Sequence, residues 1–213
     1  MNTEPRTILC FGDSNTWGAD PVTDSRFPLA ERWPGVLRQE LGSDYWVIEE
    51  GLPGRTTVWS DPIEGYKSGK EYLIPCLDSH QPLDLVIILL GTNDLKARFS
   101  LPAQDIANGA GVLVKMVQQS AAGLGGKAPQ VLLIAPPPVA DLSNTVFEEM
   151  FAGAAAKSRK FTAYYQHVAA LAGCFFLDAA SIVKSSSIDG VHLEGSEHLE
   201  LGKAVANFVR SIF

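Results

Sequence analysis

Short apolar runs that alternate with longer stretches of helical patterning constrain this 213-residue chain more than any other feature of its sequence. The runs are bounded by Gly, Pro, Asp or Asn, and several are apolar at consecutive positions, which is typical of strands buried on both faces of a parallel sheet. We expect strands at residues 7–11, 46–48, 85–90, 131–135 and 174–177. Because strands alternating with helices imply right-handed crossovers, the pattern predicts an α/β protein. The architecture that we expect is a three-layer α/β/α sandwich around a five-stranded parallel, doubly wound sheet.

The stretches between these runs carry helical periodicity. We expect helices at residues 33–41, 67–77, 102–124, 145–172 and 197–212. Pro75 interrupts the second of them, and a pair of glycines ends the third. No internal repeat, low-complexity tract or linker divides the sequence, so we expect one domain over residues 1–213.

One segment, from Thr56 to Lys70, does not fit the alternation. It follows the second expected strand and carries Trp59 and Tyr66 among turn-forming residues. We interpret it either as a surface loop or as an excursion that forms a pocket wall or a subunit contact, because aromatic residues on loops favour interfaces.

The composition limits the classes of partner. Apolar residues make up 46% of the chain and charged residues 19%, as in ordinary globular proteins, and the formal net charge is −7. Because nucleic acids and anionic membranes attract clustered Lys and Arg, we expect neither as a partner and favour small, neutral molecules. The longest apolar run, residues 83–90, is too short to cross a bilayer, and the first residues do not resemble a secretory signal. We therefore expect a cytoplasmic location.

The three cysteines, Cys10, Cys76 and Cys174, form no CxxC pair, and two of them lie in apolar runs. We interpret them as small hydrophobes rather than as redox groups. We see no His/Cys cluster with metal-ligand spacing and expect neither a metal nor a cofactor.

Polar residues follow the expected strands at the edge where parallel sheets bind ligands. Ser14 comes almost directly after the first strand, and taken alone it is a helix cap or a turn residue. Near the end of the chain, Asp189 and His192 lie three positions apart in a loop. A nucleophilic serine needs a base to accept its proton, and the base needs a carboxylate to orient it. The three residues together therefore predict a Ser-His-Asp triad.

The other histidines are weaker candidates for the base. We expect His80, His167 and His198 on the surface or on helix faces, although His198 is close enough to His192 in sequence to be a substitute for it.

Acyl transfer also needs hydrogen-bond donors aimed at the developing oxyanion. The backbone N–H groups of Ser14 and Gly54 and the side-chain amide of Asn93 are the candidates. Taken singly, Gly54 permits a turn and Asn93 caps the following segment; as a set they favour an oxyanion hole.

Four segments resemble, in order, the sequence blocks of the SGNH, or GDSL-like, hydrolase family. They are residues 12–18 (GDSNTWG), 51–54 (GLPG), 91–94 (GTND) and 189–192 (DGVH). The resemblance spans nearly the whole chain and implies a flavodoxin-like fold.

The same resemblance implies roles for individual residues. Ser14 would be the nucleophile, His192 the base, Asp189 the residue that orients His192, and Ser14, Gly54 and Asn93 the oxyanion hole. Many family members carry an Asn shortly before the glycine of the second block, where this chain has Glu49-Glu50. This departure leaves Gly51 as a rival donor.

Within the family, Trp17 and the segments around residues 49–57 resemble the bacterial arylesterase and acyltransferase branch. The resemblance implies a small acyl or aryl ester as substrate, transfer of the acyl group to alcohols or peroxide in some members, no cofactor, and a homo-oligomer. We further hypothesise that Trp17 forms a wall of the substrate pocket.

Three alternatives stay open. The same triad serves deacetylation of carbohydrates and cleavage of thioesters or lysophospholipids. A flavodoxin-like fold could instead bind phosphate or flavin at residues 13–16, which leaves Asp189 and His192 unexplained. A non-catalytic scaffold has no use for the four blocks.

Overall fold

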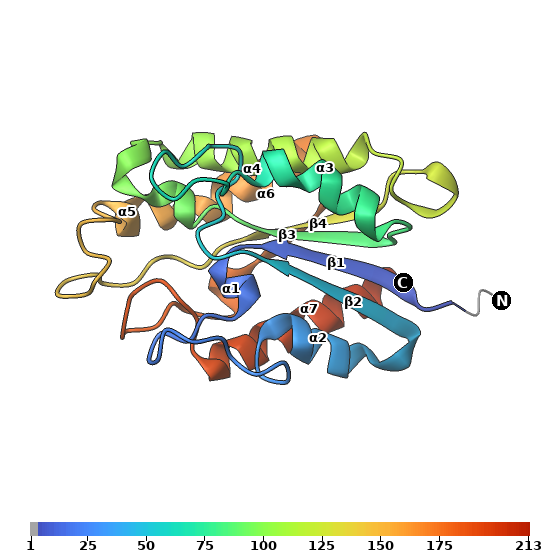
Figure 1. The fold of residues 1–213 in the computed structure, drawn as a ribbon, viewed down its shortest axis with the longest axis horizontal. Coiled ribbons are helices and arrows are strands. Elements are labelled where there is room, and N and C mark those ends of the chain that lie inside the picture. The colour runs from blue at the N-terminus through green and yellow to red at the C-terminus, as the bar shows by residue number, and fades with distance from the viewer. Residues whose placement is uncertain (1–3) are drawn as a thin grey trace.

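A computed structural model describes residues 4–213 and has a five-stranded, fully parallel sheet with the strand order β2-β1-β3-β4-β5 (Figure 1). The strands are β1 (Arg6–Gly12), β2 (Tyr45–Gly51), β3 (Leu85–Leu89), β4 (Gln130–Ala135) and β5 (Phe175–Asp178). This arrangement confirms the predicted α/β class and the strand number.

Helices cover both faces of the sheet. One face carries α2 (Trp33–Leu41) and α7 (Gly195–Ile212), and the other carries α3 (Gly69–His80), α4 (Ala103–Gln118) and α6 (Phe161–Ala172) (Figure 1). The shorter helical segments are α1 (Ser14–Trp17), α5 (Ala154–Ser158), η1 (Gly42–Asp44), η2 (Asn93–Leu95), η3 (Ala97–Phe99), η4 (Leu124–Gly126) and η5 (Ala179–Ser181). The loops that follow the strands gather at one end of the sheet, on the left of Figure 1.

The sheet is buried on both faces because its side chains alternate between two apolar clusters. In β1, Ile8 and Cys10 belong to the cluster beneath α2 and α7, whereas Leu9 and Phe11 belong to the cluster beneath α3, α4 and α6. This double burial explains the consecutive apolar residues of the strand sequences.

Two helix predictions were wrong in extent. Only α5 and α6 form within residues 145–172, because Gly153 has a left-handed φ of +79° and Phe147 packs against Phe151 in the turns before it. The helix expected at residues 102–124 ends at Gln118. The chain then turns so that the Ala122 carbonyl accepts a hydrogen bond from Leu83 ahead of β3.

Pro75 does not end its helix. It lies inside α3 on the solvent-exposed side, and the helix continues to His80. Across residues 4–213, no helix combines the length and the apolar character that a membrane span requires.

Candidate active site

Ser14 stands at the carboxyl end of the sheet, where β1 passes into the single turn of α1. Asp13 caps this turn, because its carboxylate accepts the Asn15 N–H at 3.0 Å. Since β1 lies between β2 and β3, the loops that follow all three strands meet around Ser14.

Asp189 and His192 come to Ser14 from the loop that precedes α7. The His192 Nε2 atom lies 3.0 Å from the Ser14 Oγ atom, and the His192 Nδ1 atom lies 2.6 Å from a carboxylate oxygen of Asp189. Burial raises the pKa of Asp189, but hydrogen bonds from the His192 ring and from the backbone N–H groups of Val191 and His192 outweigh burial. The pKa of Asp189 is therefore lowered, which favours a carboxylate facing the imidazole.

Asn15, which the sequence analysis did not single out, joins the serine segment to the histidine loop. Its side-chain oxygen accepts the Leu193 N–H at 3.0 Å, and its side-chain nitrogen donates to the Val191 carbonyl at 3.4 Å. Both bonds flank His192, so the buried Asn15 side chain sets the position of the imidazole relative to Ser14.

The three predicted oxyanion donors border one cavity. Ser14, Gly54 and Asn93 line it together with His192. Within residues 4–213, the Gly54 N–H donates to no other residue. The Asn93 amide donates to the Arg55 carbonyl at 3.1 Å and, through a longer bond of 3.4 Å, to the Asp13 carboxylate.

The rival donor Gly51 lies elsewhere, at the end of β2. A Cβ atom at Gly51 would lie 2.2 Å from the Trp17 backbone nitrogen, so glycine lets α1 pack directly on β2. Gly51 lines a different cavity from Ser14, whereas Gly54 lines the cavity that contains Ser14 and His192.

The cavity at Ser14 has a volume of about 350 Å³. Much of its wall is apolar, formed by Trp17, Phe147, Met150 and Phe151. The Phe147 ring meets the His192 ring edge to face, with centroids 5.7 Å apart. The turns at residues 145–153, which the sequence analysis placed in a helix, therefore supply a wall of the site.

The segment from Thr56 to Lys70 reaches the same cavity through Glu64. Glu64 forms an ion pair with Lys96, and Arg98 pairs with Asp61 at 3.1 Å. The side chains of Lys96 and Asp61 are 3% and 0% exposed, so this ion-pair cluster anchors the segment to the loop after β3. The structure thus places part of the segment in the pocket wall.

Two buried carboxyl groups, of Asp13 and Asp94, lie beside the predicted oxyanion donors. Burial raises the pKa of Asp13 to about 6 and that of Asp94 to about 7. Asp94 accepts hydrogen bonds from the Thr57 backbone N–H, at 3.0 and 3.1 Å, and from the Thr57 hydroxyl. Asp94 therefore ties the segment after Gly54 to the loop that carries Asn93.

The other three histidines were expected on the surface or on helix faces. His167 is exposed and His80 is partly buried, whereas His198 lies on α7 and is fully buried against Phe27. The His198 Nδ1 atom accepts the Trp33 N–H at 3.3 Å, and burial lowers the pKa of His198 to about 3. The ring that reaches Ser14 is that of His192.

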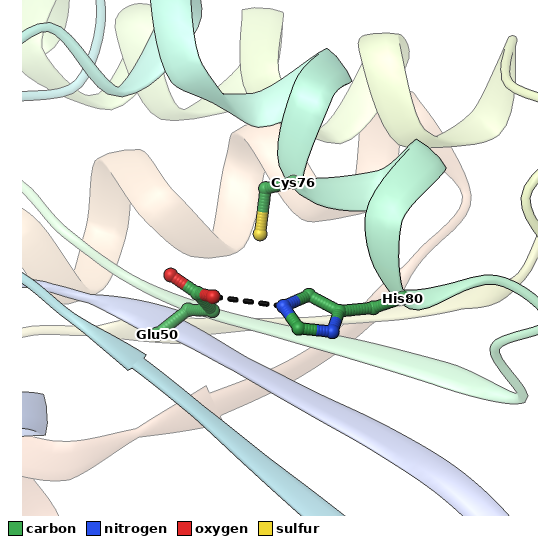
Figure 2. A group of neighbouring side chains, drawn as sticks. All are labelled: Glu50, Cys76 and His80. Atoms are coloured by element: carbon green, nitrogen blue, oxygen red, sulfur yellow. Dashed lines mark hydrogen bonds and ion pairs between the residues drawn. The ribbon is translucent and has the colours of Figure 1, made fainter.

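One group of side chains away from Ser14 has the chemistry of metal ligands. Glu50, Cys76 and His80 each offer one donor atom, and these atoms lie within 4.8 Å of one another (Figure 2). The sequence analysis missed this group, although Cys76 and His80 are four positions apart on one helix, which is a spacing that could have indicated it.

A comparison with protein-family models matches residues 10–198 to the GDSL-like lipase/acylhydrolase family. The chain belongs to this family. The match confirms the resemblance found in the sequence, and its range includes Ser14, Gly54, Asn93, Asp189 and His192.

Solved structures of other family members are closely similar to the chain. An aryl esterase of M. smegmatis is 45% identical, with 98% of this chain and 100% of that chain covered and a TM-score of 0.93. A carbohydrate acetylesterase from Sinorhizobium meliloti is 43% identical over the same shares, with a TM-score of 0.94. A putative arylesterase from Agrobacterium tumefaciens is 39% identical over the same shares, with a TM-score of 0.90. The comparison with curated protein sequences gave no significant match. The fold and the membership of a hydrolase family that contains esterases are thus established.

Proposed function

We propose that this family member is a serine esterase that hydrolyses small acyl or aryl esters through an acyl-enzyme on Ser14. The observation that carries the proposal is the position of His192. Its ring lies 3.0 Å from the Ser14 hydroxyl on one side and 2.6 Å from the Asp189 carboxylate on the other. The proposed nucleophile, base and orienting acid are therefore in hydrogen-bond contact, and Ser14 and His192 line one cavity.

In the first half-reaction, the Ser14 Oγ atom attacks the ester carbonyl carbon while His192 Nε2 takes the hydroxyl proton. The carbonyl oxygen becomes an oxyanion, which the N–H groups of Ser14 and Gly54 and the Asn93 amide receive. The carbon–oxygen bond to the alcohol then breaks, and His192 gives its proton to the departing alkoxide. Asn93 makes its hydrogen bond to the oxyanion by releasing the long bond to Asp13.

In the second half-reaction, water attacks the acyl-enzyme. His192 removes a proton from the water and returns it to the Ser14 oxygen as the acid leaves. Asp189 stabilises the imidazolium in both halves, because its carboxylate faces the Nδ1–H.

Turnover of p-nitrophenyl acetate, butyrate and octanoate tests this proposal. We expect acetate to react fastest, because the cavity is small. The Ser14→Ala variant should lose on the order of 10⁴-fold or more in rate. Ser196→Ala, at an exposed serine of α7, is the matched control and should retain the native rate. Equal, slow rates for the native chain and Ser14→Ala would contradict the proposal.

Transfer of the acyl group to an alcohol or to peroxide extends the same mechanism, with the acceptor replacing water in the second half-reaction. The apolar wall formed by Trp17, Phe147, Met150 and Phe151 supports this extension, because it favours an alkyl alcohol over water at the acyl-enzyme. The test is the ratio of ester to acid formed from vinyl acetate when butanol is added to buffer. A ratio no higher than that of the uncatalysed reaction contradicts it.

Deacetylation of carbohydrates is a second candidate for the same triad. It is favoured by the 43% identity to the carbohydrate acetylesterase of Sinorhizobium meliloti. Acetate release from an acetylated monosaccharide, compared with that from phenyl acetate, decides between the two substrate classes.

A phosphate- or flavin-binding role is less consistent with the charges around Ser14. Asp13 and Asp94 are buried behind the loop, and no lysine or arginine lies among residues 13–16. Lys96 lines the cavity, but its charge is already balanced by Glu64 and Asp61, so it offers little attraction to an anionic phosphate.

We also propose that the protein is a homo-oligomer. The segment from Thr56 to Lys70 exposes apolar side chains, with Ile63 at 75% and Tyr66 at 99% of full exposure. Clustered apolar groups on a surface segment favour association. Light scattering of the native chain and of an Ile63→Asp variant tests this, and a native monomer contradicts it.

A further inference from the structure

Helix α3 presents two metal-binding side chains toward the end of β2. Cys76 and His80 lie four positions apart, so they share one face of the helix. Glu50 is the penultimate residue of β2, and its carboxylate accepts a hydrogen bond from the His80 Nε2 atom at 2.8 Å if that nitrogen is protonated. Figure 2 shows the Cys76 sulfur pointing from α3 toward the Glu50 carboxylate and the His80 ring.

The three donor atoms are spaced almost as a tetrahedral metal site requires. All three lie within 4.8 Å of one another. Zinc bonds of about 2.3 Å to sulfur and about 2.1 Å to nitrogen or oxygen place tetrahedral ligands about 3.4–3.6 Å apart. The Glu50 oxygen and the His80 nitrogen, now 2.8 Å apart, would separate by about half an ångström and the sulfur would approach by about 1 Å or less. Side-chain rotations are sufficient for shifts of this size.

We propose that Glu50, Cys76 and His80 bind a divalent transition-metal ion of the zinc type. The three residues supply three ligands, and water fills the fourth position. When the ion binds, the Cys76 thiol loses its proton to solvent and becomes a thiolate. The two negative charges, of the thiolate and of Glu50, then balance the two positive charges of the ion.

Cys76 would not form this thiolate readily on its own. Burial, together with the charge of Glu50, raises the pKa of the Cys76 thiol to about 12. A metal ion has to displace this proton when it binds, because the thiolate is the form that coordinates metals.

Solvent reaches two of the three side chains, since those of Glu50 and His80 are 20% and 29% exposed, whereas Cys76 is buried. Glu50 lines a cavity of about 440 Å³ together with Arg55 and Tyr72. The Arg55 guanidinium is the one nearby positive group on this wall. It donates to the Gly12 carbonyl at 2.9 Å and to the Glu50 backbone carbonyl, so the Glu50 carboxylate faces His80 and the Tyr72 hydroxyl instead.

The site would join α3 to the strand that leads into the Gly54 loop. Glu50 lies four residues before Gly54 and pairs with Phe11 of β1. A bound ion would therefore stabilise the junction beside the active-site loops without contacting Ser14, and the proposal does not depend on esterase activity.

Cobalt(II) is the probe that tests this site, because thiolate–cobalt(II) bonds give a near-ultraviolet charge-transfer band and tetrahedral sites give visible bands. We expect the native chain to show both bands and to saturate at one equivalent. The Cys76→Ser variant should lose the charge-transfer band and bind at least about 100-fold more weakly. Cys174→Ser, at a half-buried cysteine outside the group, should keep the native spectrum.

Two further variants distinguish loss of the metal site from misfolding and from loss of esterase activity. His80→Gln, at a partly exposed position, should weaken cobalt binding even if Cys76→Ser fails to fold, and Ser14→Ala should bind cobalt like the native chain. A native chain without the charge-transfer band, or a band that persists in Cys76→Ser, would overturn the proposal. Hydrolysis of p-nitrophenyl acetate is measured separately, so a failed esterase assay with an intact cobalt spectrum counts only against the proposed function.

Discussion

Asn15 connects the serine segment to the histidine loop, and its replacement by alanine tests how the triad is held. The variant leaves the Leu193 N–H and the Val191 carbonyl without partners in a buried region. An unsatisfied buried group costs about 1–3 kcal/mol, and the Val191 bond is long, so we expect a total loss of about 3 kcal/mol. For a chain of this size, that loss lowers the unfolding midpoint by about 10 °C.

The effect on catalysis should exceed that of general destabilisation. The two freed backbone groups can find water only if residues 191–193 move, which carries His192 away from Ser14. A displacement of about 1 Å costs roughly 100-fold in rate. We therefore expect kcat for p-nitrophenyl acetate to fall by about 100-fold, while KM changes little because Asn15 does not line the cavity.

Steady-state kinetics at 25 °C and thermal unfolding by circular dichroism provide the two measurements. Asn207→Ala, at an exposed position of α7, is the matched control and should change neither. If Asn15→Ala unfolds at a lower temperature but keeps the native kcat, Asn15 does not position His192. If both quantities are unchanged, the assignment of a buried double hydrogen bond is wrong.

Four further predictions follow from the site. Asp189→Asn should lower kcat on the order of 10⁴-fold with little change in stability, because His192 loses the carboxylate that orients it; a loss of less than tenfold contradicts this role. Burial raises the pKa of Asp94 from 3.8 to about 7, so the folded protein favours the protonated form of this carboxyl group. The contribution of Asp94 to stability is therefore present at low pH and is lost as the pH rises from about 4 to 7. The stability of the native chain relative to Asp94→Asn should fall across this window by up to about 1.4 kcal/mol per pH unit in urea titrations, and a constant difference would refute the shift. Lys96→Met should lower the free energy of unfolding by about 3 kcal/mol, because it breaks a buried ion-pair cluster. Lys203→Met, at an exposed ion pair, is the control and should change this free energy by less than about 1 kcal/mol. Equal effects of the two variants would contradict the role given to burial. Trp17→Ala should raise the ratio of butyrate to acetate turnover by about tenfold as the pocket wall recedes, and an unchanged chain-length preference would remove Trp17 from the pocket.

The sheet and the triad geometry could be anticipated because their patterns are local. Runs such as residues 85–90 show double burial in their own composition, and Asp189 and His192 share one short loop. The catalytic roles of Ser14, Asp189 and His192 stay predictions, but their approach to hydrogen-bond distance agrees with the spacing argument.

The features that the sequence analysis did not predict depend on contacts with residues that are distant in the chain. The Ala-rich composition of residues 145–172 favoured one long helix, but Phe147 and Phe151 instead lie in turns and contribute to the cavity wall. His198 follows a charged residue in the first turn of α7, yet its burial is set by Trp33 of α2, 165 positions away. The register of β2 against β1, which places Glu50, is likewise a tertiary property.

The distance along the chain between Ser14 and His192 has a consequence for biosynthesis. The two residues are 178 positions apart and meet only after every strand of the sheet has been made. A ribosome-bound chain therefore carries Ser14, the proposed nucleophile, long before it receives Asp189 and His192. If Ser14 is the nucleophile, partly made chains remain inert toward cellular esters, and the onset of turnover marks the moment at which the sheet and α7 have closed around the site.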